Sequence, residues 1–133
     1  MKTVSHIIGC LLMLGVIISC KKEDEIKSPD IGLEQSKVIF PALADSVLVK
    51  TKYQSWHVTT VYEYIDTTET DVHSYSYRQE NDTISEDWFT MYKVRDEGIF
   101  VKVNENTLGK ERKLLIFLAT GNIFGQLVII QNK

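Results

Sequence analysis

The chain has 133 residues, with 15 Lys and Arg against 18 Asp and Glu, so its formal net charge is −3. This balance excludes a protein that binds nucleic acid mainly through charge, which needs a basic excess on at least one face. Hydrophobic residues make up 44% and charged residues 25%, as in one folded domain rather than a disordered chain. Both cysteines, Cys10 and Cys20, lie near the N-terminus, so no disulfide framework holds the rest.

Residues 1–19 have the pattern of a cleaved signal peptide. The apolar run Ile7–Ile18 is shorter than the ~20 residues that a membrane-spanning helix needs. The sequence Ile17-Ile18-Ser19-Cys20 then resembles the lipobox of bacterial lipoproteins. The resemblance implies cleavage between Ser19 and Cys20, and a lipid on Cys20 whose acyl chains, palmitate among them, anchor the protein in a membrane. The alternative is an uncleaved anchor or a buried free cysteine.

A charged run, Lys21-Lys22-Glu23-Asp24-Glu25, follows the lipid site directly. A lysine followed by acidic residues at this place resembles the lipoprotein export signal of Bacteroidetes. That resemblance implies a surface-exposed position on the outer membrane, whereas the alternative is a plain solvated tether. Residues 26–36 contain Pro29 and Gly32 and predict a linker, so residues 20–36 form a lipidated tether and residues 37–133 the domain.

The domain shows a two-residue alternation of apolar and polar side chains in short runs, and no sustained helical period. Polar or glycine-bearing breaks, among them Asp66–Asp71 and Glu80–Asp87, separate the runs. This pattern predicts an all-β, immunoglobulin-like β-sandwich of seven or eight strands. The expected strands are Val47–Val49, Trp56–Ile65, Val72–Tyr77, Trp88–Val94, Ile99–Val103, Leu114–Ala119 and Leu127–Ile130.

The strands differ in how many of their faces are apolar. The last two are apolar on both faces and are expected at the centre of a sheet, whereas Ile99–Val103 has one apolar and one polar face. Trp56 and Trp88 are predicted to fill the space between the sheets. The polar stretch Thr59–Ser85 predicts a long hairpin or loop excursion.

Aromatic side chains are the one feature with ligand-binding character. Tyr62 and Tyr64 are two residues apart, as are Tyr75 and Tyr77, so each pair is expected to share a strand face, with His73 on the second face. Rings at this spacing could stack on the C–H faces of sugars, which makes these five residues the candidate glycan contacts. The alternative is cross-strand aromatic pairing that stabilises the hairpin.

No catalytic arrangement is present, and the sequence predicts a protein that is not an enzyme. Beyond the signal peptide, His57 and His73 are the histidines, and no thiol besides Cys20 is available, so the sequence predicts neither a metal site nor a cofactor. No serine-nucleophile elbow or phosphate-binding glycine loop occurs. The run Asp66–Asp71 has oxygen ligands for calcium but lacks the glycine of an EF-hand loop, so a solvated turn is the better interpretation.

A set of residues occurs in a characteristic order along the domain: Trp56, Trp88, Val101-Lys102-Val103-Asn104-Glu105-Asn106, Arg112 and Leu127-Val128-Ile129-Ile130-Gln131-Asn132. This order resembles the BACON domain, the Bacteroidetes-associated carbohydrate-binding module. The likeness covers residues 37–133, although the separation between the tryptophans is longer than that family suggests. It implies a non-catalytic sandwich that binds or presents glycans in polysaccharide or mucin capture; the alternative is a spacer or protein-interaction module of a cell-surface complex.

Overall fold

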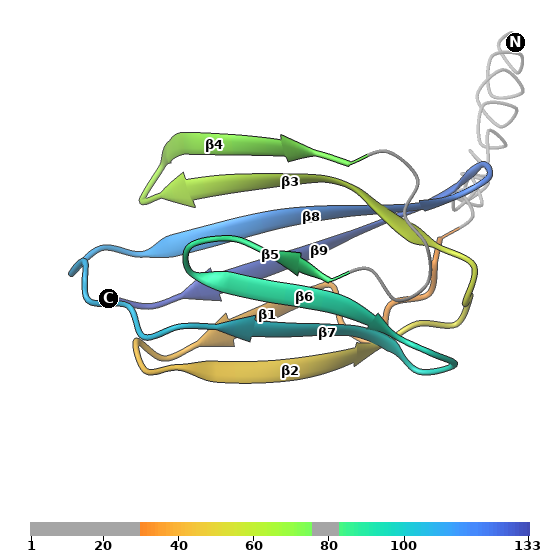
Figure 1. The fold of residues 1–133 in the computed structure, drawn as a ribbon, viewed down its shortest axis with the longest axis horizontal. Coiled ribbons are helices and arrows are strands. Elements are labelled where there is room, and N and C mark those ends of the chain that lie inside the picture. The colour runs from red at the N-terminus through yellow and green to blue at the C-terminus, as the bar shows by residue number, and fades with distance from the viewer. Residues whose placement is uncertain (1–29, 76–82) are drawn as a thin grey trace, which may run out of the picture.

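The computed structural model describes residues 30–75 and 83–133, which form nine β-strands in two sheets (Figure 1). The five-stranded sheet has the order β1-β9-β8-β3-β4, and the four-stranded sheet has the order β2-β7-β6-β5. The strands are β1 (Lys37–Phe40), β2 (Asp45–Lys50), β3 (His57–Ile65), β4 (Thr68–Ser74), β5 (Ile84–Ser85), β6 (Phe89–Val94), β7 (Gly98–Val103), β8 (Arg112–Thr120) and β9 (Ile123–Gln131).

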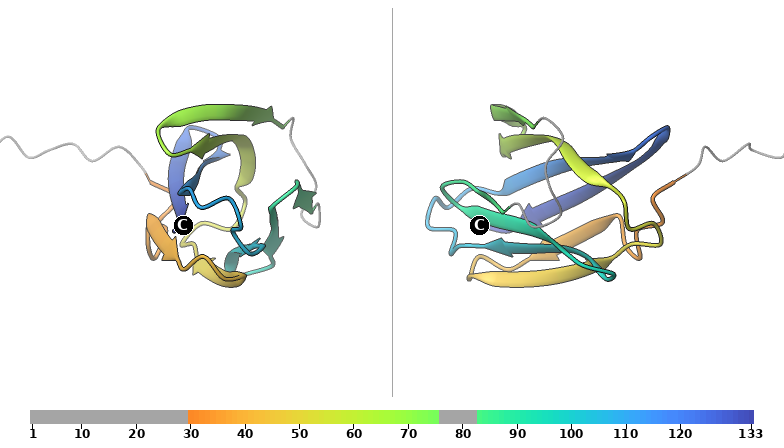
Figure 2. Two further views of the ribbon diagram at one scale, coloured as in Figure 1. Left: turned by 90° about the vertical axis from the view of Figure 1, so that its left-hand side faces the viewer. Right: turned by 45° about the vertical axis from the view of Figure 1, so that its right-hand side comes forward.

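The two sheets face each other as an immunoglobulin-like sandwich, which confirms the predicted fold class (Figure 2). β1 runs parallel to β9, and the other strand pairs are antiparallel. The described residues contain nine strands rather than seven or eight, because the sequence pattern missed β1 and β5. These strands have four and two residues, too few for an alternation to be recognised.

β8 and β9 lie inside the five-stranded sheet, as their two apolar faces predicted. Leu114, Ile116 and Leu118 of β8 are fully buried, and Leu115 and Phe117 on the opposite face are half-buried. In β7, Ile99, Val101 and Val103 are fully buried while Lys102 is exposed, which confirms the predicted polar face. The β8–β9 hairpin turns at Gly121, whose φ of 54° suits glycine.

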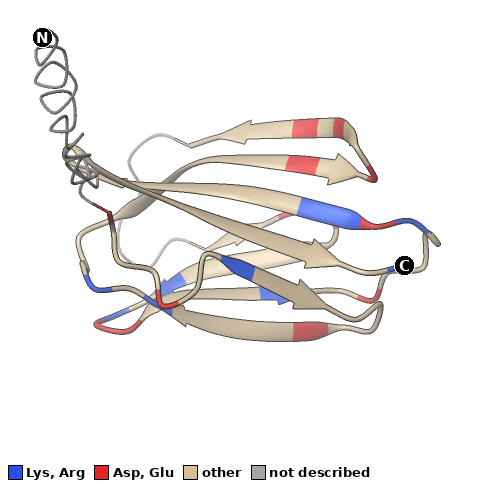
Figure 3. Cartoon of the chain, turned by 180° about the vertical axis from the view of Figure 1, so that it is seen from behind, with Lys and Arg blue, Asp and Glu red and all other residues tan. Residues whose placement is uncertain are grey.

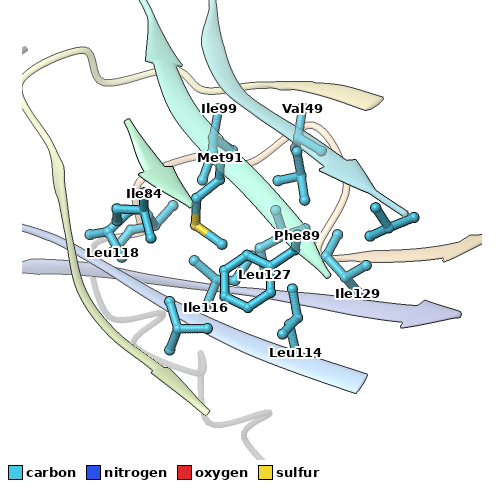
Figure 4. Close-up of a cluster of buried hydrophobic side chains, with 14 of the residues drawn as sticks. Val49, Ile84, Phe89, Met91, Ile99, Leu114, Ile116, Leu118, Leu127 and Ile129 are labelled. Atoms are coloured by element: carbon cyan, nitrogen blue, oxygen red, sulfur yellow. The ribbon is translucent and has the colours of Figure 1, made fainter. Parts of the chain in front are cut away.

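The core lies between the sheets, where side chains from both layers point toward one another (Figure 4). Phe89 and Met91 of β6 meet Leu127 and Ile129 of β9, each at most 1% exposed. Trp56 is 3% exposed, as predicted for a core residue. Trp88 is half-buried and packs against the edge of this cluster.

The packed domain begins before residue 37, so the predicted linker boundary is wrong. Ile31 is fully buried in the core, and the Asp30 backbone bridges to Phe124 of β9. The Leu33 backbone bridges to Thr51. Gly32, whose presence favoured a linker, has a φ of 72°, a backbone conformation that suits glycine, and it directly follows the buried Ile31.

The predicted break at Asp66–Asp71 is also wrong beyond its first two residues, since β4 begins at Thr68. Asp66, with a φ of 52°, turns the chain from β3 directly into β4. β4 is an edge strand, and every residue except His73 is exposed. An exposed edge strand favours polar residues, which made it resemble a loop. The predicted strand Val72–Tyr77 ends at Ser74, and Tyr77 lies outside the described residues.

Candidate functional site

The candidate binding surface is the side of the five-stranded sheet that faces away from the core, named here the outer face. Two neighbouring rows of side chains cross it from β1 to β4. The first row is Lys37, Val128, Leu115, Tyr62 and Val72, and the second is Ile39, Ile130, Lys113, Tyr64 and Glu69. The alternate residues of these strands fill the core, so the strand register places both rows on the outer face.

The first row is apolar at its centre, whereas the second row has Lys113 between Ile130 and Tyr64. Val128, Leu115 and Ile130 are half-buried by their neighbours, while Ile39 and Val72 at the two edges are 56% and 41% exposed. β9 carries no charged residue, and the charges of β8 are confined to its start at Arg112 and Lys113, as Figure 3 shows from behind. The outer face is therefore an apolar surface on two central strands.

Tyr62 and Tyr64 lie on this face, two residues apart on β3, as their spacing predicted. The Tyr62 ring packs edge-on against Phe117, with centroids 5.6 Å apart and an interplanar angle of 75°. The Lys113 ammonium lies 4.4 Å from the Tyr64 ring centroid, and the Tyr64 hydroxyl donates to Glu69 at 3.2 Å. Desolvation, followed by this hydrogen bond, raises the pKa of Tyr64 above 10.0, so its hydroxyl is neutral near pH 7.

His73 and Tyr75 lie on the opposite side of the sheet, which separates them from Tyr62 and Tyr64. The two rings stack with centroids 6.4 Å apart and an interplanar angle of 21°. Both are half-buried, and Tyr75 packs against the core. The five candidate glycan contacts therefore do not form one surface: two lie on the outer face, two lie on the core side, and Tyr77 lies outside the described residues.

A cluster of polar side chains around His73, named here the His73 cluster, links β3 and β4 to the second sheet. The His73 Nε2 lies 2.6 Å from Oε1 of Glu63, and the other Glu63 oxygen accepts a 2.6 Å hydrogen bond from the Trp88 indole. Tyr75 donates from its hydroxyl to Glu86 at 3.3 Å. The cluster therefore connects edge strand β4 to the residues that flank β5.

The charges in this cluster favour a protonated imidazole. Burial alone would lower the pKa of His73, but the hydrogen bond to Glu63 and the charges of Glu86, Glu63 and Asp71 raise it above 6.5. The Glu86 and Asp71 carboxylates lie 3.6 Å and 3.7 Å from the imidazole nitrogens. Within residues 30–75 and 83–133, no group of three or more His, Cys, Asp or Glu is placed to hold a metal ion. The contacts of Glu63 with Trp88 and of His73 with Glu86 join the two sheets.

The closing residues of the BACON resemblance form a second polar cluster, named here the latch, at the C-terminal end. The guanidinium of Arg112 donates to the Gln131 side-chain oxygen at 2.7 Å and 3.2 Å, and to the Asn104 carbonyl at 2.8 Å. It also stacks on Trp88, 4.4 Å from the ring centroid. The Gln131 amide in turn donates to the carbonyls of Ala42, Leu43 and Asn104.

Asn106 continues the latch toward the end of the chain. Its side-chain amide donates to the carbonyls of Lys110 and Asn132 at 2.7 Å and 2.8 Å, and its side-chain oxygen accepts from the Leu108 amide. Asn106, Arg112 and Gln131 are all buried. These three residues of the resemblance therefore maintain the fold.

Sequence reasoning missed an aromatic pair on the exposed side of the other sheet. Tyr92 of β6 and Phe100 of β7 face each other across the strands, with centroids 4.9 Å apart and an interplanar angle of 32°. Tyr92 is 38% exposed. The alternation in both strands contained the signal, because Met91 and Val101 point into the core and their neighbours must point outward.

Comparison with known proteins supports the fold alone. Neither a family model nor a curated protein matches the sequence. The solution structure of a protein from Bacteroides thetaiotaomicron is similar, with 19% identity and a TM-score of 0.56, and the match covers 80% of this chain and 83% of that one. In the described part of the chain, no helix is long and apolar enough to cross a membrane.

Proposed function

We propose that this chain is a lipid-anchored, non-catalytic protein of the cell envelope that docks a partner protein through its outer face. The observation that carries the proposal is the apolar centre of that face, formed by Val128, Leu115, Ile130 and Tyr62 on strands whose other side already fills the core. A contiguous apolar surface with a polar margin is typical of a protein interaction site.

The size of the outer face approaches that of a stable interface. Its strands have four, nine, nine, nine and seven residues, and at ~3.3 Å per residue and ~4.8 Å between strands they give a surface of roughly 600 Å². A standard interface buries about 800 Å² on each partner. The charged residues of the two rows are Lys37, Lys113 and Glu69, so the surface carries a small positive excess. The expected partner therefore has an apolar centre with acidic residues at its rim.

The geometry of the tyrosines favours a protein over a glycan. A sugar ring stacks on a flat exposed aromatic face, but Tyr62 stands edge-on to Phe117 and Tyr64 already has the Lys113 ammonium over its ring. The rest of the surface is mainly aliphatic, with hydrogen-bonding groups at its margins. Fully buried apolar contacts with a polar rim are the usual anatomy of a protein interface.

The anchoring part of the proposal rests on the sequence. The lipobox-like Ile17-Ile18-Ser19-Cys20 and the acidic run that follows support lipidation at Cys20 and a surface-exposed position on the outer membrane. The BACON resemblance supports an accessory role beside larger surface proteins. Its signature residues in the latch are explained by structure, so they do not favour a glycan over a protein ligand.

The proposal is tested by extracting the full chain from its own membranes in mild detergent and separating complexes on a native gel. Leu115→Glu places a charge on the outer face, and Phe100→Glu places one at a matching half-buried position on the other sheet. We expect the wild type and Phe100→Glu to migrate in a complex and Leu115→Glu to migrate alone, with circular dichroism showing all three folded. A Leu115→Glu chain that stays in the complex, or a wild type that migrates alone, would contradict docking.

Glycan binding is measured separately, with the purified chain on plant, host-mucin and microbial polysaccharides. We expect no glycan to bind. A reproducible hit that is lost in Tyr62→Ala but kept in Tyr92→Ala would overturn the protein proposal and assign the outer face to a glycan.

A further inference from the structure

We propose that the end of the sandwich at which the tether leaves the domain rests on the lipid headgroup layer, with Phe124 and Tyr53 as the contacting side chains. This inference depends on the proposed lipid at Cys20, and it adds an orientation that the outer-face proposal does not contain. It concerns the end of the domain formed by Asp30–Gly32, the loop Thr51–Ser55 and the tip of the β8–β9 hairpin.

These three segments converge around Ile31. The Ile31 amide donates to the Phe124 carbonyl at 3.3 Å, and the Tyr53 amide donates to the Ile31 carbonyl at 3.1 Å. The Ser55 and Thr120 hydroxyls lie 2.9 Å apart and hold the loop against the hairpin tip. Phe124 and Tyr53 therefore flank the point where the described chain begins, at the same end as the β8–β9 tip and opposite the C-terminus (Figure 1).

The exposure of these aromatic residues is not explained by the fold. Phe124 is 64% exposed although the neighbouring Ile31 is fully buried, and Tyr53 is 39% exposed. The Lys52 ammonium lies 5.7 Å from the Tyr53 ring centroid. Aromatic rings beside a lysine suit a headgroup layer, where the ring contacts acyl chains and the ammonium contacts phosphate.

The point at which the tether joins the domain favours membrane contact at this end. Cys20 and Asp30 are joined by backbone that spans at most about 35 Å when fully extended. The opposite end, with Leu43 and Leu108, lies a further ~30 Å away along the nine-residue strands β8 and β9. Contact at Phe124 therefore needs only a tether that is not extended away from the membrane, whereas contact at the far end also requires the domain to fold back.

The test uses the full lipidated chain in vesicles of phosphatidylethanolamine and phosphatidylglycerol. Phe124→Cys and Leu43→Cys are matched label positions, because the native residues are 64% and 65% exposed at opposite ends of the domain. Each cysteine carries an environment-sensitive fluorophore, since the lipid on Cys20 removes that thiol from the reaction. Brominated lipids in the vesicles then quench any fluorophore that enters the headgroup region.

We expect several-fold stronger quenching at position 124 than at position 43, and a repeat with Tyr53→Cys to agree with position 124. Equal quenching at the two ends, or stronger quenching at position 43, would overturn the inference and leave outer-face docking standing. The mass of the mature protein is measured in the same preparation. An unmodified Cys20 would overturn the anchor and the membrane orientation together, and the native-gel result would still decide docking.

Discussion

At the scale of single residues, the C-terminal end depends on Gln131, a fully buried side chain that satisfies four partners. Gln131→Leu keeps much of the volume but removes the acceptor of two Arg112 hydrogen bonds and the donor to the Leu43 carbonyl, while the carbonyls of Ala42 and Asn104 each keep one other donor. We expect a loss of about 3 kcal/mol in the free energy of unfolding, measured with urea. The control is Gln126→Leu on the same strand, where the side chain is exposed and the expected change is under ~0.5 kcal/mol.

His73 makes the stability of the domain depend on pH. Its pKa in the folded protein is raised above 6.5 by Glu63, Glu86 and Asp71, against the opposing effect of burial. Folding therefore favours the protonated form of His73. The stabilisation is complete at pH values below the pKa of His73 in the unfolded state, and it is lost as the pH rises through the pKa of His73 in the folded state. We expect the stability difference between wild type and His73→Gln to shrink from pH ~6 to pH ~9 in urea titrations. A difference that grows with pH would contradict the charge assignment.

At the scale of elements, Gly98 sets the distance between β2 and β7. A Cβ atom at Gly98 would lie 2.0 Å from the Val49 carbonyl oxygen, and a backbone atom cannot move away without breaking the sheet. At Gly125, the nearest atom is the Ile31 Cβ at 3.1 Å, which would have to move by only a few tenths of an ångström. We expect Gly98→Ala to lower the midpoint of thermal unfolding far more than Gly125→Ala. Similar midpoints for the two variants would show that β2 and β7 can separate.

The elements also show what the sequence could predict. The strands β7, β8 and β9 were predictable because each buries alternate residues over six or nine positions. Only the second part of β4 was predicted as a strand, because residues 68–71 of this exposed edge strand have the composition of a loop. The burial of Ile31 depends on contact with Phe124, which is far away in the chain and leaves no local pattern.

The candidate site was predictable only in part for the same reason. The shared face of Tyr62 and Tyr64 follows from their spacing on one strand. The position of His73 on the core side depends on the β3–β4 register, which is shifted between Glu63 and Tyr64. The apolar surroundings of the two tyrosines depend on the pairing of β3 with β8, which joins residues more than forty positions apart, Tyr62 with Leu115 among them.

At the scale of the whole molecule, the two polar clusters and the outer face have different roles in the sandwich. The latch and the His73 cluster hold the sheets together from within, and their residues are engaged in hydrogen bonds. The outer face takes no part in this, and strands β8 and β9 place the apolar side chains of Leu115, Val128 and Ile130 on it. We therefore place the biological contact on the outer face rather than in the polar clusters.

The most direct test of docking through the outer face is photo-crosslinking in living cells, from one position on the outer surface of each sheet. A benzophenone side chain replaces Tyr62 on the outer face in one strain and Tyr92 on the other sheet in a second strain. We expect a discrete cross-linked protein from position 62 and none of that size from position 92. A product of the same size from position 92 alone, or no product from position 62, would contradict docking through the outer face.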